Sequence, residues 1–290
     1  MLRIQTDRLL LEIGEPGEIY RGARFDWTGI VQQVTLDGRH TFCTVEGGGT
    51  EGVGLTNEFG LFTPVGYEEA RTGGRFPKLG VGLLTRDEDK PYDFFRPYEI
   101  KPFPMSVHTG SNEVVFTVDP VPCGGYAVRL TKTLRAEGNR LTVEYELENA
   151  GDRPIVTEEY NHNFLLLNGR GIGAEYALTA DRPVALEPRD PSRRPYRQPE
   201  ADSVRWEDGF EGDFYFRLSG ADGSAVQKWR LENRAAGVYV EEYVPEAFRM
   251  AVWGTPVIIS PEVFVQVDVQ PGQKQVWSRR WEFGTLESAR

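Results

Sequence analysis

Acid–base chemistry near neutral pH has few candidate residues in this chain. The 290 residues include only three histidines, His40, His108 and His162, and imidazole is the side chain whose ordinary pKa lies closest to neutrality. His40 follows the turn Asp37-Gly38-Arg39, and His108 precedes the polar stretch Thr109-Gly110-Ser111-Asn112. We interpret both as solvated residues of loops or strand ends, because loop histidines are usually only solvated.

His162 has different neighbours. It lies in Glu158-Glu159-Tyr160-Asn161-His162-Asn163-Phe164, a cluster of carboxylates, amides and an aromatic ring, directly before Leu165-Leu166-Leu167. This segment is too polar for a core strand, which leaves two interpretations. It is either a chemical site or the start of a strand that asparagine side chains cap.

The second candidate is a glutamate at the end of an apolar stretch. The segment Met250–Glu262, MAVWGTPVIISPE, delivers one carboxylate after Ser260-Pro261. Burial of Glu262 against Trp253 and Ile258 would raise the pKa of its carboxyl toward that of a working general base. The alternative is a strand-end glutamate that points to solvent, and that alternative is preferred if Glu262 has no partner.

The apolar pattern predicts the elements that hold these side chains. Its period is two, with turn residues about every eight to twelve positions, which is typical of an antiparallel sandwich or barrel. No window has the apolar stripe of a capped helix, so we predict an all-β, antiparallel fold with few short helical turns. The clearest predicted strands are Gly29–Leu36, Glu113–Val118, Tyr126–Leu134, Leu141–Leu147, Phe214–Leu218, Ala225–Leu231, Gly237–Val244, Val263–Val269 and Gln275–Phe283.

The connections between these strands carry turn residues. Arg135–Arg140 is predicted to be a Gly/Asn hairpin connection, and Pro271-Gly272 a type II turn. Short helical turns are allowed at Pro64–Ala70. The segment Leu186–Asp202 is rich in Pro, Arg, Asp and Glu, which predicts a solvated loop, or else a rim or lid.

Length and charge limit the classes of function. We predict one domain over residues 1–290, because large β-sandwiches reach roughly 250 residues as single units. The formal charge is −11 and no basic cluster occurs, so neither nucleic acid nor an anionic membrane is an expected partner. The first residues hold no uninterrupted apolar run, which favours a soluble, cytoplasmic protein. Cys43 and Cys123 lie far apart without CxxC spacing, so we expect reduced cysteines and no zinc site.

Four segments, taken in order along the chain, carry a resemblance to a known family. They are Gly22-Ala23-Arg24 before the strand Gly29–Leu36, then Gly74-Arg75-Phe76, then LTVEYELENAGDRPIVTEEYNHNFLLLNG from Leu141 to Gly169, and last Glu262 with Pro271-Gly272 and the strand Trp277–Phe283. Together they resemble the aldose 1-epimerase, or galactose-mutarotase-like, superfamily. The order Arg75, His162, Glu262 is also the order in that family, and the resemblance spans roughly the whole chain.

The resemblance implies a β-supersandwich whose concave face holds a pyranose, with no metal or organic cofactor. His162 would be the general acid on the ring oxygen, and Glu262 the general base on the anomeric hydroxyl. The implied substrate-binding residues are Arg75, Arg24 and Lys78 for polar groups, Tyr160 or Trp253 for stacking, and Asn161. The implied activity is that of a mutarotase, which interconverts sugar anomers by opening and closing the ring.

The chain also departs from the family's pattern. The family's second histidine is missing, because Lys90–Pro104 contains none and His108 lies too far along to replace it. The family's substrate-binding aspartate has no counterpart that we can place, and the glutamate stands in Ser-Pro-Glu-Val-Phe instead of a Glu-Pro context. These departures indicate a divergent branch. The basic residues Arg24, Arg75, Lys78 and Arg96 favour a carboxylated, sulfated or phosphorylated sugar.

Two other classes of function stay open. One is a non-catalytic carbohydrate-binding protein that keeps the concave face, because a fold alone does not carry function. The other is an accessory domain of a polysaccharide lyase or hydrolase. The sequence leaves the identity of the sugar and the oligomeric state open.

Overall fold

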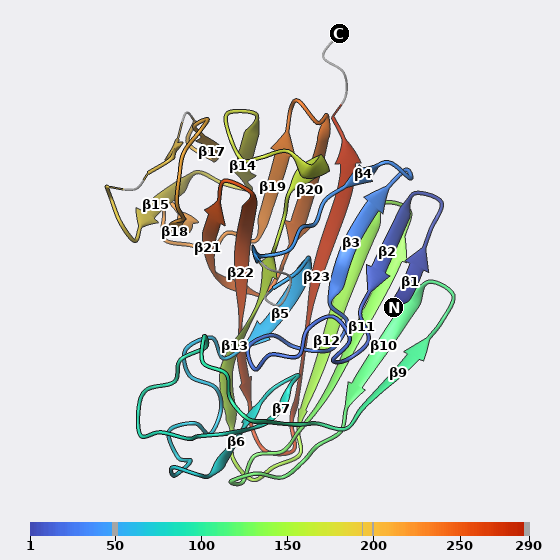
Figure 1. Ribbon diagram of the computed structural model, residues 1–290, viewed down its shortest axis with the longest axis vertical. Coiled ribbons are helices and arrows are strands. Elements are labelled where there is room, and N and C mark those ends of the chain that lie inside the picture. The colour runs from blue at the N-terminus through green and yellow to red at the C-terminus, as the bar shows by residue number, and fades with distance from the viewer. Residues whose placement is uncertain (48–51, 193, 199, 287–290) are drawn as a thin grey trace.

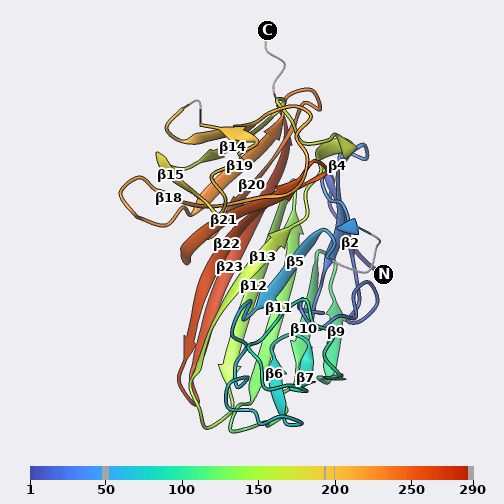
Figure 2. The same cartoon turned by 60° about the vertical axis from the view of Figure 1, so that its left-hand side comes forward.

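Two large antiparallel sheets lie one against the other (Figures 1 and 2). The computed structural model describes residues 1–47, 52–192, 194–198 and 200–286. Within these ranges the one complete helical element is the 3-10 turn η2 (Leu167–Gly169). The predicted all-β, antiparallel fold class is therefore confirmed.

The first sheet has ten strands and carries five of the selected residues, which are Tyr160, Asn161, His162, Trp253 and Glu262. Strand β13 lies near its middle, between β5 and β22. In spatial order the strands are β1 (Leu2–Gln5), β2 (Leu9–Ile13), β3 (Val31–Leu36), β5 (Leu55–Phe59), β13 (Ile155–Asn163), β22 (Ile258–Val269), β21 (Ala247–Thr255), β18 (Phe214–Gly220) and β15 (Val184–Pro188), with β4 (His40–Thr41) paired to β3.

The second sheet also has ten strands and contains the clearest hairpin of the sequence. In spatial order they are β16 (Tyr196–Arg197), β17 (Ser203–Trp206), β14 (Tyr176–Ala180), β19 (Lys228–Asn233), β20 (Val238–Tyr243), β23 (Lys274–Thr285), β12 (Arg140–Asn149), β11 (Val128–Glu137), β10 (Glu113–Val118) and β9 (Met105–Thr109). Apolar residues from the facing sides of the two sheets form one continuous core.

A small third sheet supports the site from one end. It consists of β6 (Arg75–Lys78), β7 (Gly82–Thr85) and β8 (Ile100–Pro102), near the bottom of Figure 1. A second apolar cluster packs Phe76 and Leu84 of this sheet against Phe25 and Trp27 of the segment before β3 and against Phe164, which follows β13. The strand of His162 is thus covered on both faces.

The strand predictions hold, with shifted ends. Strand β11 continues to Glu137 and β12 begins at Arg140, because outward polar and inward apolar residues keep alternating up to the turn. The hairpin connection is therefore shorter than the predicted Arg135–Arg140. At Pro271-Gly272 the predicted turn is confirmed, since Gly272 has φ of 74° and the Gln273 amide donates to the Gln270 carbonyl.

Two predictions about polar segments need correction. Residues Glu158–Phe164 were expected to be too polar for a core strand, yet Glu159–Asn163 are buried inside β13. Leu186–Asp202 is not wholly a loop, because its start belongs to β15 and it contains β16. Residues 193 and 199 of that segment lie outside the described residues.

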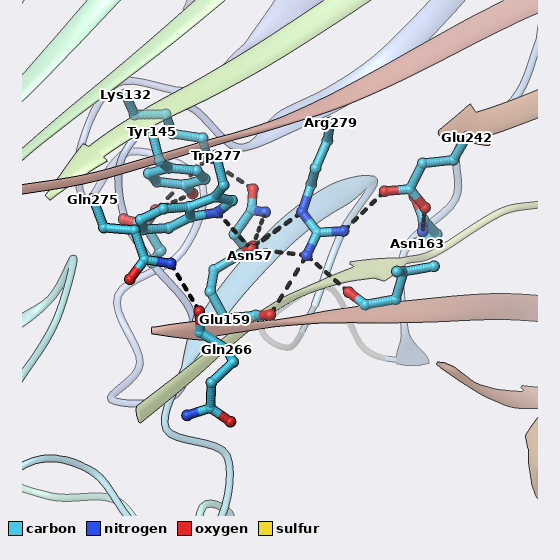
Figure 3. Close-up of polar contacts among 12 residues, drawn as sticks. Asn57, Lys132, Tyr145, Glu159, Asn163, Glu242, Gln266, Gln275, Trp277 and Arg279 are labelled. Carbon is cyan, nitrogen blue, oxygen red and sulfur yellow. Dashed lines mark hydrogen bonds and ion pairs between the residues drawn. The ribbon is translucent and has the colours of Figure 1, made fainter. Parts of the chain in front are cut away.

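Buried ion pairs explain why a polar strand can occupy the core. The Arg279 guanidinium of β23 donates to Glu159 over 2.8 Å and to Glu242 over 3.0 Å, and all three side chains are fully buried (Figure 3). Trp277 Nε1 and Asn57 Nδ2 also donate to the Glu159 carboxylate, over 3.0 Å and 2.6 Å. Buried charges are tolerated when they are paired and hydrogen-bonded in this way.

The remaining global expectations concern cysteines, membranes and metals. Cys43 and Cys123 are free, and burial raises the pKa of the Cys43 thiol to about 12. Among the described residues we find no helix with the length and hydropathy needed to cross a membrane. The same residues contain no group of three or more His, Cys, Asp or Glu side chains that could hold a metal ion.

Candidate functional site

Strand pairing brings His162 and Glu262 together. Strands β13 and β22 pair with Tyr160 opposite Phe264, and the same register two residues further along sets His162 opposite Glu262. Both side chains lie on the face of the first sheet that is turned away from the second sheet, because successive strand residues alternate between faces. The two residues are 100 positions apart in sequence and meet because the pairing joins distant segments.

A cavity of about 590 Å³ lies over this face. Its size is within the usual range of small-molecule sites. His162 and Glu262 form part of its wall, together with side chains of β15, β18, β21 and of the loops before β3 and between β5 and β8. The aromatic lining consists of Phe62, Phe94, Phe95, Tyr160, Tyr215 and Trp253, and the other charged lining residues are Arg24, Arg189, Arg217, Arg249, Glu46 and Glu187.

His162 and Glu262 are in direct contact. His162 Nε2 lies 3.2 Å from Glu262 Oε1, and the two residues are 4% and 5% exposed. Ser260 Oγ lies 2.9 Å from His162 Nδ1 and donates toward Glu262 Oε1 over 3.4 Å. The Phe164 ring stacks on the imidazole with centroids 4.0 Å apart. The imidazole is therefore fixed in position and orientation.

Burial moves the pKa values of this pair in opposite directions. Burial, with a smaller contribution from Glu58, raises the pKa of the Glu262 carboxyl to about 8, and Arg24 opposes this rise. Burial, together with Arg24, holds the pKa of His162 well below its usual range. At neutral pH Glu262 is therefore protonated and His162 neutral.

The hydrogen bonds agree with this neutral form. If the Ser260 hydroxyl donates to Glu262, its oxygen accepts from the Nδ1–H of His162, because a hydroxyl has one hydrogen. The Nε2 lone pair of His162 then accepts the proton of the Glu262 carboxyl. The arrangement thus holds one transferable proton between a carboxyl and an imidazole at the cavity wall.

A second polar cluster lies beside the pair. Arg24 Nε donates to Glu58 Oε2 over 2.9 Å, and Arg24 Nη2 donates to the Tyr160 hydroxyl over 3.0 Å. Tyr160 in turn donates to Glu58 over 2.7 Å, and Lys78 Nζ donates to Glu58 Oε1 over 3.1 Å. The Arg24 guanidinium packs against the rings of Phe25 and Phe94, at 4.5 and 4.6 Å from their centroids.

Comparisons with known proteins give one result at the level of structure. No protein-family model matches the chain, and no curated protein matches its sequence. Solved structures match over nearly the full length: a galactose mutarotase-like protein from Lactobacillus casei (14% identity, 98% of this chain and 100% of that chain, TM-score 0.61), a galactose mutarotase related enzyme from Lactobacillus acidophilus (12%, 99% and 98%, 0.63) and an aldose epimerase homologue from C. elegans (12%, 99% and 99%, 0.56). The chain has the galactose mutarotase-like fold.

Within this mutarotase-like fold, five of the eight predicted site residues line one cavity. They are His162, Glu262, Arg24, Tyr160 and Trp253. Trp253 is half-buried and presents its ring to the cavity edge-on to His162, with ring centroids 5.4 Å apart. Tyr160 is almost fully buried and stacks on Phe264, so its hydroxyl serves Arg24 and Glu58 and little of its ring is open to a ligand.

The other three predicted residues lie outside the cavity lining. Asn161 points to the interior, because it alternates with Tyr160 and His162 along β13, and its amide has no hydrogen-bond partner among the described residues. Lys78 is fully buried behind Glu58 and does not line the cavity. Arg75 is exposed at the start of β6, outside the lining. Arg96 of the basic set forms surface ion pairs with Glu88 and Asp87.

Several residues at the cavity wall or directly behind it were missed by the sequence analysis. Glu58 is the one acidic residue of the fully buried strand Leu55–Phe59, and a carboxylate in an apolar stretch is a usable signal. Phe94-Phe95 form an aromatic pair within a charged, proline-containing loop, and such a pair also stands out. Local sequence patterns could not have identified Arg249 and Tyr215 as cavity residues. They reach the cavity only because β18 pairs with β21 and β21 pairs with β22.

Proposed function

We propose that the protein is an aldose 1-epimerase that interconverts the anomers of a sugar, with His162 and Glu262 as its proton-transfer pair. The observation that carries the proposal is the buried His162–Glu262 contact of 3.2 Å at the wall of a sugar-sized cavity. The fold of aldose epimerase homologues supports it at the level of architecture.

The reaction needs one proton removed and one delivered at the same time. A base takes the proton of the anomeric hydroxyl while an acid protonates the ring oxygen, so the bond between the anomeric carbon and the ring oxygen breaks and a carbonyl forms. Rotation about the adjacent carbon–carbon bond and the reverse proton transfers close the ring on the other face. A pair that holds one proton in total supplies both roles.

The contact between the two groups lets the proton occupy either one. In the neutral form Glu262 is the acid and His162 the base, and transfer across the 3.2 Å contact exchanges these roles. The family resemblance assigns the acid role to His162, which corresponds to the exchanged form. We therefore treat the pair as one unit that carries one proton, since coupled groups titrate together.

The cavity offers the other contacts that a sugar requires. Trp253 and Tyr215 are adjacent across β21 and β18, where they can cover the apolar face of a pyranose. Arg24 and the cavity-lining Arg249 provide donors for hydroxyl groups or for an acidic substituent.

Anomer exchange is the direct test. Freshly dissolved α-anomers of neutral sugars, uronic acids and sugar phosphates are followed by polarimetry or NMR with and without the protein. We expect acceleration for at least one of them, and a loss of about 10²- to 10⁴-fold in His162→Gln and in Glu262→Gln. The double variant should be no worse than either single variant, because the residues act as one unit.

Matched controls separate chemistry from general damage. His40→Gln changes a histidine that hydrogen-bonds Asn168, and Glu113→Gln changes a glutamate paired with Arg135 on the second sheet. Both variants should retain the wild-type rate. The rate of the wild type should fall above about pH 8, where the pair loses its proton, and the proposal fails if no sugar of the three classes is accelerated.

A non-catalytic carbohydrate-binding protein is the second candidate function. The observation that favours it is that His162 and Glu262 satisfy each other directly, so no group of the pair needs a ligand. Sugar binding without any acceleration of anomer exchange, together with unchanged affinity in Glu262→Gln, would select this function.

A further inference from the structure

A buried cluster beside the cavity, which reaches the cavity wall through Arg24, has more positive than negative charge. Arg24 and Lys78 both pair with the single carboxylate of Glu58, over 2.9 and 3.1 Å. The side chains of Lys78 and Glu58 are fully buried, and that of Arg24 is 14% exposed. Two cations that share one carboxylate leave a surplus of one positive charge.

The charge states of the cluster follow from its contacts. Although burial acts in the opposite direction, Lys78 and Arg24 hold the pKa of Glu58 below its usual value, so this carboxylate is ionised. Burial lowers the pKa of Lys78, but Glu58 opposes that shift, and the Lys78 ammonium donates to both Glu58 and the Gly60 carbonyl over 3.1 Å. Tyr160 stays neutral because burial raises its pKa well above the usual range.

The other cations around the cavity have carboxylate partners of their own. The pairs are Arg249 with Glu158 at 2.9 Å, Arg189 with Asp213 at 2.9 Å and Arg217 with Glu187 at 3.9 Å. Glu262 adds no negative charge at neutral pH, because its proton is retained. Glu46 also lines the cavity and has an interaction partner of its own.

Arg24 has donor capacity left on the cavity side. Its Nε and Nη2 donate to Glu58 and Tyr160, whereas its Nη1 makes no hydrogen bond with the described part of the chain. The guanidinium also packs against the rings of Phe25 and Phe94. A fixed guanidinium with a free edge is the arrangement that binds carboxylates and phosphates best.

We propose that the substrate of this site is a sugar with an acidic substituent, a carboxylate or a phosphate, that binds the free edge of Arg24. This inference rests on the proposed function, since it names the substrate class of the same cavity. The physical reason is that an uncompensated buried charge is costly, and an anionic group of the ligand compensates it. A neutral sugar would leave the surplus charge in place.

Binding measurements with paired sugars test the inference. Calorimetry compares D-glucose with D-glucuronate and D-glucose 6-phosphate, and D-galactose with D-galacturonate and D-galactose 6-phosphate. We expect at least one acidic sugar to bind about tenfold or more tightly than its neutral parent, as a charge-assisted contact implies. A preference for the uronates identifies a carboxylate site, and a preference for the 6-phosphates identifies a phosphate site.

Variants assign the preference to Arg24. Arg24→Gln should lower the ratio of acidic-sugar affinity to neutral-sugar affinity from about tenfold to about twofold or less, whatever it does to the affinity for the neutral parent. Arg129→Gln removes an equal charge from an Asp119 pair on the second sheet and should keep the preference. If Arg24→Gln does not fold, the salt dependence of the wild-type preference replaces it: the advantage of the acidic sugar should shrink from 20 to about 500 mM salt.

The outcomes separate this inference from the proposed function. Equal or tighter binding of the neutral parents, or an acidic preference that survives Arg24→Gln, overturns the inference. Accelerated anomer exchange of neutral sugars with no acidic preference overturns it alone and leaves the epimerase intact. An acidic preference without any anomer exchange supports the inference and overturns the epimerase.

Discussion

Strand β13 carries two polar clusters on its opposite faces, and they differ in how completely their charges are paired. On the interior face, Glu159 and Glu242 share the Arg279 guanidinium between the two sheets (Figure 3). On the cavity face, His162 contacts Glu262, and the nearby Glu58 carboxylate pairs with the two cations Arg24 and Lys78. The same strand therefore carries one network whose charges are fully paired within the chain and one whose charges are not.

The difference indicates that buried charges have two roles in this fold, one structural and one at the candidate site. The interior network is sealed on every side, and its ionic side chains have partners within the chain, so its role is to hold the sheets in place. The cavity cluster borders an open space, has a displaced carboxyl pKa and carries surplus charge. Displaced pKa values beside a cavity are typical of functional sites.

The largest effect is expected from breaking the interior network. Arg279→Met leaves the Glu159 and Glu242 carboxylates buried without their cation, which should lower the free energy of unfolding by about 3–5 kcal/mol. Urea denaturation measures this loss in the free energy of unfolding. Arg280→Met makes the same chemical change at the next, exposed position and should cost little. Equal losses in the two variants would contradict a structural role for the network.

An intermediate effect is expected from Glu262→Gln, and it should depend on pH. Burial raises the pKa of Glu262 from 4.5 to about 8, so its protonation contributes stability that is complete below pH 4.5 and lost as the pH rises through 8. The stability of the wild type relative to Glu262→Gln should therefore fall between pH 5 and 9, by at most about 1.4 kcal/mol per pH unit. Urea midpoints across this range measure it, and a constant difference would mean that Glu262 is ionised in the fold.

The smallest effect is expected from Arg75→Gln. The family resemblance makes Arg75 a sugar ligand, whereas its side chain is exposed at the start of β6 and outside the cavity lining. The apparent affinity for sugar and the rate of anomer exchange should stay within about twofold of the wild type, as for most surface substitutions. A tenfold loss would restore Arg75 to the site and would mean that the cavity extends to the third sheet.

The sequence predicts the fold better than it predicts the site. Alternation along β10, β11 and β12 shows directly in the residue pattern, because these strands have one face in the core and one in solvent. Strand β13 hides its alternation, since Glu159 and Asn163 are as buried as Tyr160 and His162. Its polar interior face depends on Arg279, about 120 residues away, which no local pattern reveals.

The two proton-transfer candidates could be selected because their types are rare or out of place. His162 is one of three histidines, and Glu262 interrupts an apolar run. Arg75, Lys78 and Asn161 were selected by resemblance or by adjacency, and neither says which face of a strand a side chain occupies. Strand alternation would have excluded Asn161 once His162 was chosen, because neighbours in a strand face opposite ways.

The pairing of β13 with β5 and β22 also has a consequence for the stage of folding at which the candidate site forms. Tyr160 contacts Glu58, 102 residues away in sequence, and His162 contacts Ser260, 98 residues away. Both are therefore long-range contacts. Such contacts form slowly, because the entropy of closing a long loop is lost before the contacts contribute any stabilising energy. During refolding, the proposed anomer-exchange activity should therefore return only with the slowest kinetic phase, after hairpins such as β11–β12 have formed.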